Sequence, residues 1–304
     1  MKIHEAAKQF LIHGRTDRVY ADETRQKQRD CFASWILPRI GNHEVETVTL
    51  RDVLEIRDAI LKRGLSESRL SSVLAALKVF FEFCHAALKI ECMNPGEIRL
   101  PPKKKPNVVF HTPDEIEEIF GFLNLNHFAD LRLRAFCELV LGTGMRTGEA
   151  LRMDRTPFDQ DQAEMDIVGK GGKVRTVFFS DRCRFWVKRY LAVRWDSHPA
   201  LFITTGDPPR RWAREDVSRF FIDLSEKAGV KKKFTPSVLR HTYCTTLRNN
   251  GVDISIIKEL AGHSDIQTTA RYYLGTDEQV LRRAVDEHLH YGEKKAFDKP
   301  SVSS

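Results

Sequence analysis

The segment AEMDIVGKGGKVRTVFFS, residues 163–180, decides the fold class because it interrupts a chain whose pattern is otherwise helical. Runs of β-branched and aromatic residues lie on both sides of the central Gly-Lys-Gly-Gly at 169–172. A glycine-rich turn between two such runs is typical of a β-hairpin. We therefore predict a mainly α chain with a small antiparallel β-sheet.

Apolar residues at helical spacing surround this hairpin. The sequence TPDE at 112–115 is a helix start, with a hydroxyl N-cap, a proline at the first position and acids in the first turn. We predict helices at 113–123 and 129–141. Helical patterns return from about residue 182 to about residue 290, with Gly262 as one C-cap.

The N-terminal 100 residues predict a separate helical bundle. A long helix is expected between Ser66 and Ile90. The apolar stripe of this helix consists of Leu70, Val73, Leu74, Leu77, Phe81, Cys84 and Leu88. Shorter stripes within 3–11, 31–36 and 50–60 predict three further helices, and elements of this kind pack as a compact bundle.

A proline- and lysine-rich run separates the two halves. The sequence PPKKKP at 101–106 contains three prolines, which deny it a helix. We expect an N-terminal domain at 1–100, a linker at 101–111, a second domain at 112–290 and a polar tail at 291–304. The lysines suit a solvated spacer or a strap against a phosphate backbone, and the two are compatible.

Composition sets broad limits on the function. The chain has 304 residues, 49 Lys and Arg against 42 Asp and Glu, and a net charge of +7. This length suits two domains, and the charge points mildly to a polyanionic partner. The six cysteines form no C-x-x-C pair, the N-terminus lacks a signal peptide, and no apolar run could span a bilayer. We expect a cytoplasmic protein that binds no metal or other cofactor and no membrane.

Five polar side chains of the second half suit chemistry on a phosphodiester. They are Arg146, Lys170, Arg240, His263 and Tyr272. Two guanidinium groups can clamp the non-bridging oxygens, a phenol can attack, and a lysine or histidine can supply a proton. Taken singly, each has a simpler explanation, such as an i,i+3 surface ion pair between Arg146 and Glu149, a turn lysine, or a tyrosine in a core.

Together, these residues resemble the tyrosine recombinase family, also called phage integrases. Four boxes follow the family's order, with Ala261 in place of the usual leucine at the start of the last box and Ser237 in place of the usual histidine of the third. They are T-G-x-R-x-x-E at 143–149, G-K-G-x-K-x-R at 169–175, H-x-L-R-H-T, matched from Val238 onward, and L-G-H-x-x-I-x-T-T-x-x-Y at 261–272. The Asn-Pro end of the first domain and the linker are also similar, so the resemblance covers about residues 1–290.

The resemblance implies a site-specific DNA recombinase. It implies a SAM-like helical core-binding domain and a mixed α/β catalytic domain, which together clamp double-stranded DNA. Tyr272 would form a 3′-phosphotyrosyl bond and release a 5′-hydroxyl. Arg146 and Arg240 would hold the phosphate, Lys170 would protonate the leaving oxygen, and His263 would hydrogen-bond the phosphate. No cofactor is implied, and strand exchange would need a homo-tetramer.

Three further positions lie in or beside the arginine boxes and have supporting or uncertain roles. Ser237 stands where the family usually has histidine, and a hydroxyl cannot shuttle a proton at neutral pH as an imidazole does. His241 lies about 100° around the helix from Arg240 and matches a structural position of the family, so we do not take it as the substitute. Glu149 would orient the arginine and histidine network from behind.

Two alternatives remain open from the sequence. A type IB topoisomerase uses the same chemistry without strand exchange, and Ser237 motivates a non-catalytic DNA-binding protein. The last predicted helix, at 277–290, carries a narrow stripe of Leu281, Val285 and Leu289. This stripe would dock on its own domain or, as an exchanged element, on a neighbouring copy.

Overall fold

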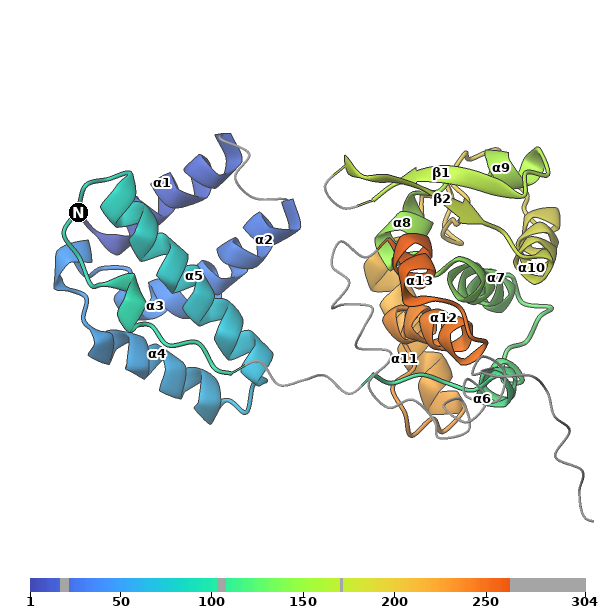
Figure 1. Cartoon of the computed structure of the whole chain (residues 1–304). Helices are drawn as coiled ribbons and strands as arrows, with labels where there is room; N and C mark the ends of the chain where they lie inside the picture. The colour runs from blue at the N-terminus through green and yellow to red at the C-terminus, as the bar shows by residue number, and fades with distance from the viewer. Residues whose placement is uncertain (17–21, 103–107, 170–171, 263–304) are drawn as a thin grey trace, which may run out of the picture. The chain divides into compact units, whose positions relative to one another are not determined.

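The computed structural model describes residues 1–16, 22–102, 108–169 and 172–262. The chain divides into two compact units, Met1–Lys105 and Pro106–Ser304 (Figure 1). Within the described residues, both units are mainly helical, and one two-stranded antiparallel sheet is present. The predicted fold class is therefore confirmed. The described residues leave out 103–107 of the predicted linker, the predicted helix at 277–290 and the tail.

The N-terminal unit is a helical bundle with an aromatic core. Its elements are α1 (Ile3–Thr16), α2 (Asp22–Cys31), the π-helix η1 (Phe32–Ile36), α3 (Leu37–Ile40), the 3-10 helix η2 (Val45–Thr47), α4 (Leu50–Lys62), α5 (Glu67–Ala86) and the 3-10 helix η3 (Pro95–Glu97). The rings of Phe10 and Phe32 meet that of Phe80 edge-on, with centroids 5.8 and 5.3 Å apart. Such edge-to-face pairs stabilise a core beyond the apolar area that they bury.

The predicted long helix is confirmed as α5. The Ser66 hydroxyl caps it by accepting a hydrogen bond from the Arg69 backbone N–H at 3.3 Å. In α4 the helix is confirmed, but its inward face differs in part from the predicted stripe. The stripe expected within 50–60 included Leu50 and Leu54, but each of these is 37% exposed, and Ile56 is buried instead.

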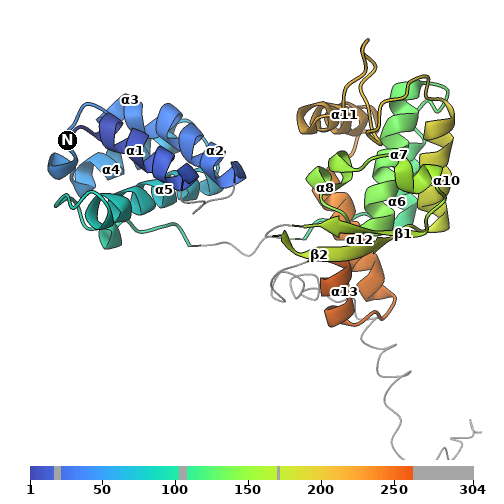
Figure 2. The same ribbon diagram turned by 90° about the horizontal axis from the view of Figure 1, so that it is seen from above.

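The C-terminal unit is built around α7 (Figure 2). Its elements are α6 (Pro113–Phe120), α7 (Phe128–Thr143), α8 (Thr147–Arg152), α9 (Thr156–Asp159), β1 (Glu164–Val168), β2 (Val174–Phe178), α10 (Asp181–Ala192), α11 (Arg214–Lys227), α12 (Pro236–Asn249) and α13 (Ile254–Ala261). Helix α7 packs against both α10 and α12. Its buried side chains therefore point to more than one side, as a helix enclosed by its neighbours requires.

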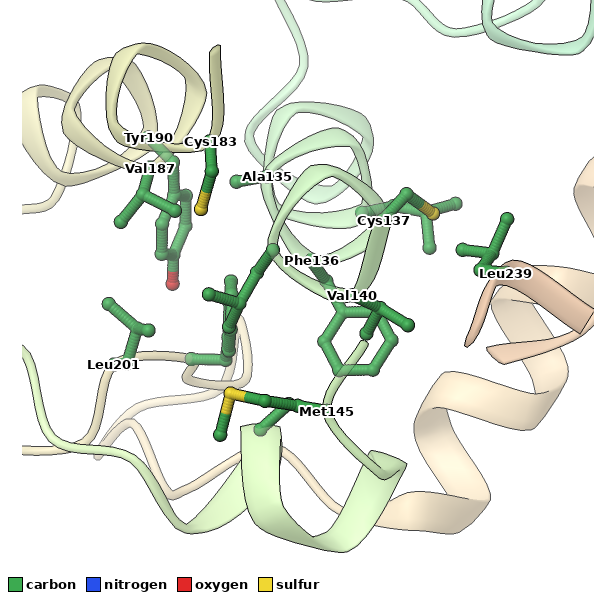
Figure 3. Close-up of a cluster of buried hydrophobic side chains, with 14 of the residues drawn as sticks. Ala135, Phe136, Cys137, Val140, Met145, Cys183, Val187, Tyr190, Leu201 and Leu239 are labelled. Carbon is green, nitrogen blue, oxygen red and sulfur yellow. The ribbon is translucent and has the colours of Figure 1, made fainter. Parts of the chain in front are cut away.

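Figure 3 shows this core around α7. Phe136 and Val140 of α7 lie near Met145 and Leu239, and Leu201 belongs to the same core on the side of Tyr190. All of these side chains are fully buried. Burial of this kind stabilises the fold by about 25 cal/mol per Å² of apolar surface. The position of α7 relative to α12 is thereby fixed, and this relation places the candidate site.

The predicted hairpin is confirmed as β1 and β2. Its register pairs Glu164 with Phe178 and Val168 with Val174, and β2 packs against α13. The turn closes through a hydrogen bond of 2.8 Å from the Gly169 N–H to the Lys173 carbonyl. Helix α6 begins as predicted but ends at Phe120 rather than 123, where i→i+3 bonds tighten its last turn.

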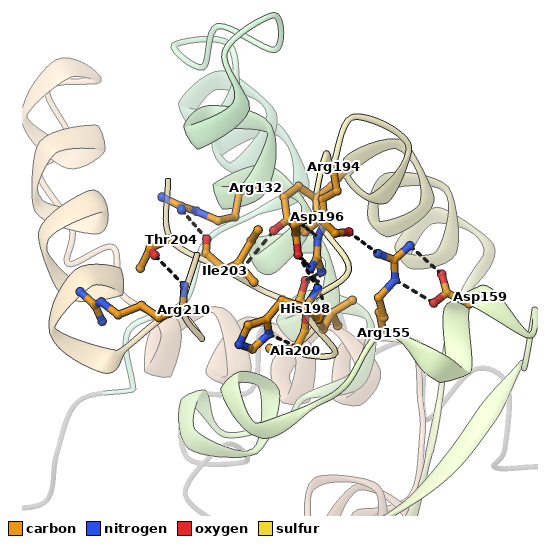
Figure 4. A network of polar contacts seen from close by, with 12 residues as sticks. Arg132, Arg155, Asp159, Arg194, Asp196, His198, Ala200, Ile203, Thr204 and Arg210 are labelled. Carbon is orange, nitrogen blue, oxygen red and sulfur yellow. Dashed lines mark hydrogen bonds and ion pairs between the residues drawn. The ribbon is translucent and has the colours of Figure 1, made fainter. Parts of the chain in front are cut away.

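Polar side chains hold the long loop between α10 and α11 (Figure 4). The guanidinium of Arg194 is fully buried and donates to the Asp196 carboxylate at 2.9 Å. Arg132 of α7 donates to the Ile203 carbonyl at 2.6 Å, and its guanidinium carbon lies 4.3 Å from the centre of the Trp212 ring. The bond from Arg132 satisfies the carbonyl of the buried residue Ile203. Among the described helices, none is both long and apolar enough to cross a bilayer.

Candidate active site

Arg146 lies in the turn between α7 and α8. Helix α7 ends in a left-handed C-cap at Gly144, with φ of 63°, and α8 begins directly after Arg146. The Arg146 backbone N–H donates to Glu149 Oε2 at 2.9 Å, and its Nη1 donates to Oε1 at 3.0 Å. The Arg146 side chain remains 36% exposed. The turn therefore fixes one face of the guanidinium and leaves the group accessible.

Arg240 lies on α12 and is almost completely buried, with 6% exposure. Its Nη1 donates to the Gly144 carbonyl and its Nη2 to the Ala261 carbonyl. Burial and the nearby charge of Arg146 lower the pKa of Arg240 to about 10. The group remains protonated at neutral pH, so the site retains this positive charge.

The two arginines meet at the C-terminal end of α13. Arg146 Nη2 donates to the Gly262 carbonyl at 2.8 Å, next to the carbonyl of Ala261 that Arg240 binds. A third guanidinium, that of Arg175 on β2, donates from Nε to the Leu260 carbonyl at 3.3 Å. Cations suit a helix C-terminus because its carbonyls carry partial negative charge. Three separate elements thus bring three guanidinium groups to one helix end.

Glu149 sits behind these groups and accepts four hydrogen bonds. Two come from Arg146, and two come from Arg175, at 3.2 Å from Nη1 and 2.7 Å from Nη2. Burial by itself would raise the pKa of Glu149, but the bonds from Arg175 and Arg146 outweigh it and lower the pKa to about 2. The carboxylate is 5% exposed, so the explanation of a surface ion pair is wrong.

Sequence reasoning gave Arg175 no role. The residue closes the G-K-G-x-K-x-R box, and this was its only signal in the sequence. Nothing in the spacing reveals that Arg175 shares a carboxylate with Arg146, because the two residues lie on different elements. Lys170, His263 and Tyr272 lie outside the described residues.

Ser237 is exposed on the first turn of α12, one turn before Arg240. The helix is capped by Thr235, whose hydroxyl accepts from the Val238 N–H at 3.3 Å. His241 is half-buried, and burial lowers its pKa, while a hydrogen bond to the backbone of Val109 opposes this shift. His241 therefore ties the start of the C-terminal unit to α12, which fits the structural role expected for it.

Within the ranges that the structure describes, no group of three His, Cys, Asp or Glu side chains is placed to hold a metal ion. All six cysteines are free thiols, and five of them are buried. Burial raises the pKa of the Cys183 thiol to about 12 and that of Cys244 to about 11, so these thiols stay neutral. Buried neutral thiols of this kind act as core residues.

Comparison with known proteins places the chain in a family. The profile of the phage integrase family matches residues 110–279. The tyrosine recombinase XerC of Vibrio campbellii is 30% identical over 245 residues, which cover 79% of this chain and 76% of the relative. XerC of Vibrio parahaemolyticus is 28% identical over 94% of this chain and 92% of its own length.

Solved structures share the fold. The Tn1549 transposon integrase in complex with transposon right end DNA matches with a TM-score of 0.76 at 18% identity, covering 95% of this chain and 100% of that one. A lambda integrase dimer bound to a core site matches with a TM-score of 0.72 at 15% identity, covering 88% and 97%. The family interval spans more than half of this chain and includes both arginines and Glu149. The chain therefore belongs to the phage integrase family of tyrosine recombinases.

Proposed function

We propose that this site-specific recombinase cleaves and rejoins double-stranded DNA by holding a backbone phosphate between Arg146 and Arg240 while Tyr272 attacks it. The convergence of the two guanidinium groups on the end of α13 carries this proposal. Arg146 and Arg240 lie 94 positions apart in the sequence and meet there. Arg146 pairs with a buried carboxylate and Arg240 is itself buried, so a surface ion pair accounts for neither residue.

The charges of the site favour an anionic ligand. Arg146 and Arg175 share the Glu149 carboxylate, and Arg240 lies at the same helix end, so the three guanidinium groups keep a net positive charge. Each guanidinium has five N–H donors, and the bonds described for Arg240 use two of its nitrogens once each. The remaining donors suit the non-bridging oxygens, whose negative charge grows as the nucleophile attacks. Donors that are already in place stabilise that charge without reorganisation.

The remaining roles follow from the family's boxes. Tyr272 would form the 3′-phosphotyrosyl ester, and Lys170 would protonate the leaving 5′ oxygen. His263 would hydrogen-bond the phosphate. The ester preserves the energy of the broken bond, so a 5′-hydroxyl of the partner strand can attack it without ATP. Ser237 would contribute a hydrogen bond but no proton transfer at neutral pH.

We further propose that strand exchange takes place in a homo-tetramer on two DNA duplexes. The Tn1549 and lambda integrase structures contain DNA, and the lambda protein is described as a dimer on its core site. The predicted helix at 277–290 is the candidate exchanged element. Truncation after Thr276 should abolish synapsis, measured by the mass of the complex in light scattering, and an unchanged tetramer would contradict this assignment.

Trapping of the covalent intermediate tests the catalytic proposal. A recognition site is first selected from random duplexes by binding to the chain, and a nick next to the scissile phosphate then prevents religation. The wild-type chain should form a covalent adduct, and Tyr272→Phe should abolish it without weakening DNA binding. Tyr273→Phe is the matched control and should leave the adduct unchanged. Binding without any adduct in the wild type would favour a non-catalytic DNA-binding protein.

A further inference from the structure

We propose that Arg175 is a positioning residue that aims Arg146 at the scissile phosphate and seats the end of α13 beside it. This inference rests on the proposed function, because it assigns a task within the same site. Arg175 has no place among the five side chains that the boxes suggest for the chemistry. Its contacts nevertheless join β2, α8 and α13.

The bonds of Arg175 direct it away from substrate. Its Nη1 and Nη2 both donate to the Glu149 carboxylate, and its Nε donates to the Leu260 carbonyl. All three nitrogens are therefore engaged by the protein. The Arg175 side chain is only 9% exposed, against 36% for Arg146. Arg146 is the accessible member of the pair, and Arg175 lies behind it.

Glu149 transmits the effect of Arg175 to Arg146. The carboxylate is shared, since each oxygen accepts one bond from Arg175 and one from Arg146. Without Arg175, a buried carboxylate would be left with Arg146 as its sole cationic partner among the described residues. A fork-to-fork pair with both oxygens is then the favoured geometry. That pair would turn the Arg146 guanidinium toward Glu149 and away from the phosphate.

Arg175 also forms the surface on which two glycines lie. A Cβ on Gly262 would stand 2.8 Å from the Arg175 Cδ and Nη1, and one on Gly169 would stand 3.3 Å from Nη1. Gly262 also has φ of 63°, so both space and backbone require glycine there. In the sequence, Gly169 precedes Lys170 and Gly262 precedes His263. The same guanidinium therefore packs against both chain segments that lead to these two candidate residues.

A substrate with an uncharged scissile group distinguishes an effect of Arg175 on the position of Arg146 from an effect on the stability of the fold. In a methylphosphonate, a methyl group replaces one non-bridging oxygen, so less negative charge develops and the aim of Arg146 matters less. We compare single-turnover adduct formation on phosphodiester and methylphosphonate nicked sites, using the full chain, Arg175→Gln and Arg175→Lys. Arg155→Gln is the matched control, because Arg155 also binds one carboxylate through two bonds, at 2.7 and 3.2 Å to Asp159.

On the phosphodiester, Arg175→Gln should slow adduct formation by about tenfold to a hundredfold, the cost of misplacing a reacting group by about 1 Å. The loss should shrink at least about threefold on the methylphosphonate, an estimate from the smaller charge that needs stabilising. Arg175→Lys keeps the charge without the two-bond fork and should fall between wild type and Arg175→Gln. Arg155→Gln should match wild type on both substrates.

An equal loss on the two substrates, or no loss, would overturn the proposal. If Arg175→Gln fails to fold by circular dichroism, Arg175→Lys decides, and a wild-type rate for Arg175→Lys on the phosphodiester overturns the proposal as well. A wild-type chain that forms no adduct at all counts against the proposed function instead. The two failures are thus distinguishable.

Discussion

At the scale of single residues, the charge of Glu149 depends on the two arginines that surround it. Its pKa is lowered to about 2 in the folded chain, whereas an unperturbed glutamate has a pKa of about 4.3. A carboxylate of this kind stabilises the folded state above its unfolded pKa. That contribution is lost as the pH falls from the unfolded value toward the folded one.

We therefore expect Glu149→Gln to flatten the acid dependence of stability. The free energy of unfolding of the wild type should fall between about pH 5 and pH 2 through protonation of this group, and the variant should lack that part of the slope. Urea unfolding at several pH values measures the difference. Parallel curves for the two proteins would show that Glu149 is not held ionised.

Ser237 gives a second prediction at this scale. An imidazole at this position could exchange a proton near neutral pH, which a hydroxyl cannot do. Ser237→His should raise the rate of adduct formation by about a hundredfold, the lower end of the range for general acid–base catalysis. Ser237→Ala is the matched control and should not exceed wild type. Equal rates for Ser237→His and wild type would mean that proton transfer is supplied elsewhere.

The sequence predicts residue identity better than residue environment. The boxes identify Arg146 and Arg240 before any coordinates are known, because the spacing of the motif is a linear property. The i,i+3 spacing of Arg146 and Glu149 is the same for an exposed pair and for a buried one. Only the folded chain shows that Glu149 is buried and that Arg175 of β2 binds it, so its four donors and the role of Arg175 could not be predicted.

At the scale of elements, the turn between α7 and α8 places both arginines. Gly144 ends α7 in the left-handed region, and its carbonyl binds Arg240, while Arg146 follows two residues later. The Tyr243 ring of α12 fills the space that a side chain would need, because a Cβ on Gly144 would stand 2.4 Å from the ring. The close approach of α7 and α12 thus requires a glycine.

Gly144→Ala should therefore destabilise the fold more than backbone strain alone explains. Gly229→Ala is the matched control, since Gly229 has φ of 60° and nothing within 4 Å of its added Cβ. The control should cost about 1–2 kcal/mol for the left-handed conformation. Gly144→Ala should cost about 1–3 kcal/mol more through overpacking. Equal losses in thermal or urea unfolding would contradict the close packing of Tyr243.

Elements with strong local patterns were predicted well. The hairpin follows from β-branched and aromatic runs on both sides of a glycine-rich turn, and α5 follows from a helical stripe; both are confirmed. The π-helix at Phe32–Ile36 was not predicted, because its residues keep the apolar spacing of an ordinary helix. The end of α6 at Phe120 was also missed, since apolar residues continue to Leu123 while the chain turns at Gly121 through i→i+3 hydrogen bonds.

At the scale of the whole molecule, each unit has a core of its own. The core of the N-terminal unit is drawn from residues 3–98, and the largest core of the C-terminal unit from residues 116–239. We propose that these are separate domains joined by a linker at 101–111. Separate cores of this size support independent folding.

Limited trypsin digestion tests this organisation. Cleavage should come first after Lys103 or Lys104, because trypsin does not cut the Lys105–Pro106 bond, and this cleavage yields two fragments. Both fragments should keep their helical circular dichroism and unfold cooperatively when purified. A single cleavage that causes either fragment to lose its structure would contradict the division into two domains.

The most direct test of the central claim is to locate the DNA on the chain. After adduct formation on the nicked site, proteolysis and mass spectrometry identify the peptide that carries the nucleotide. We predict a 3′-phosphate ester on Tyr272 and a released 5′-hydroxyl on the other DNA fragment. A nucleotide linked to any other residue, or a 5′-linked product, would contradict the mechanism.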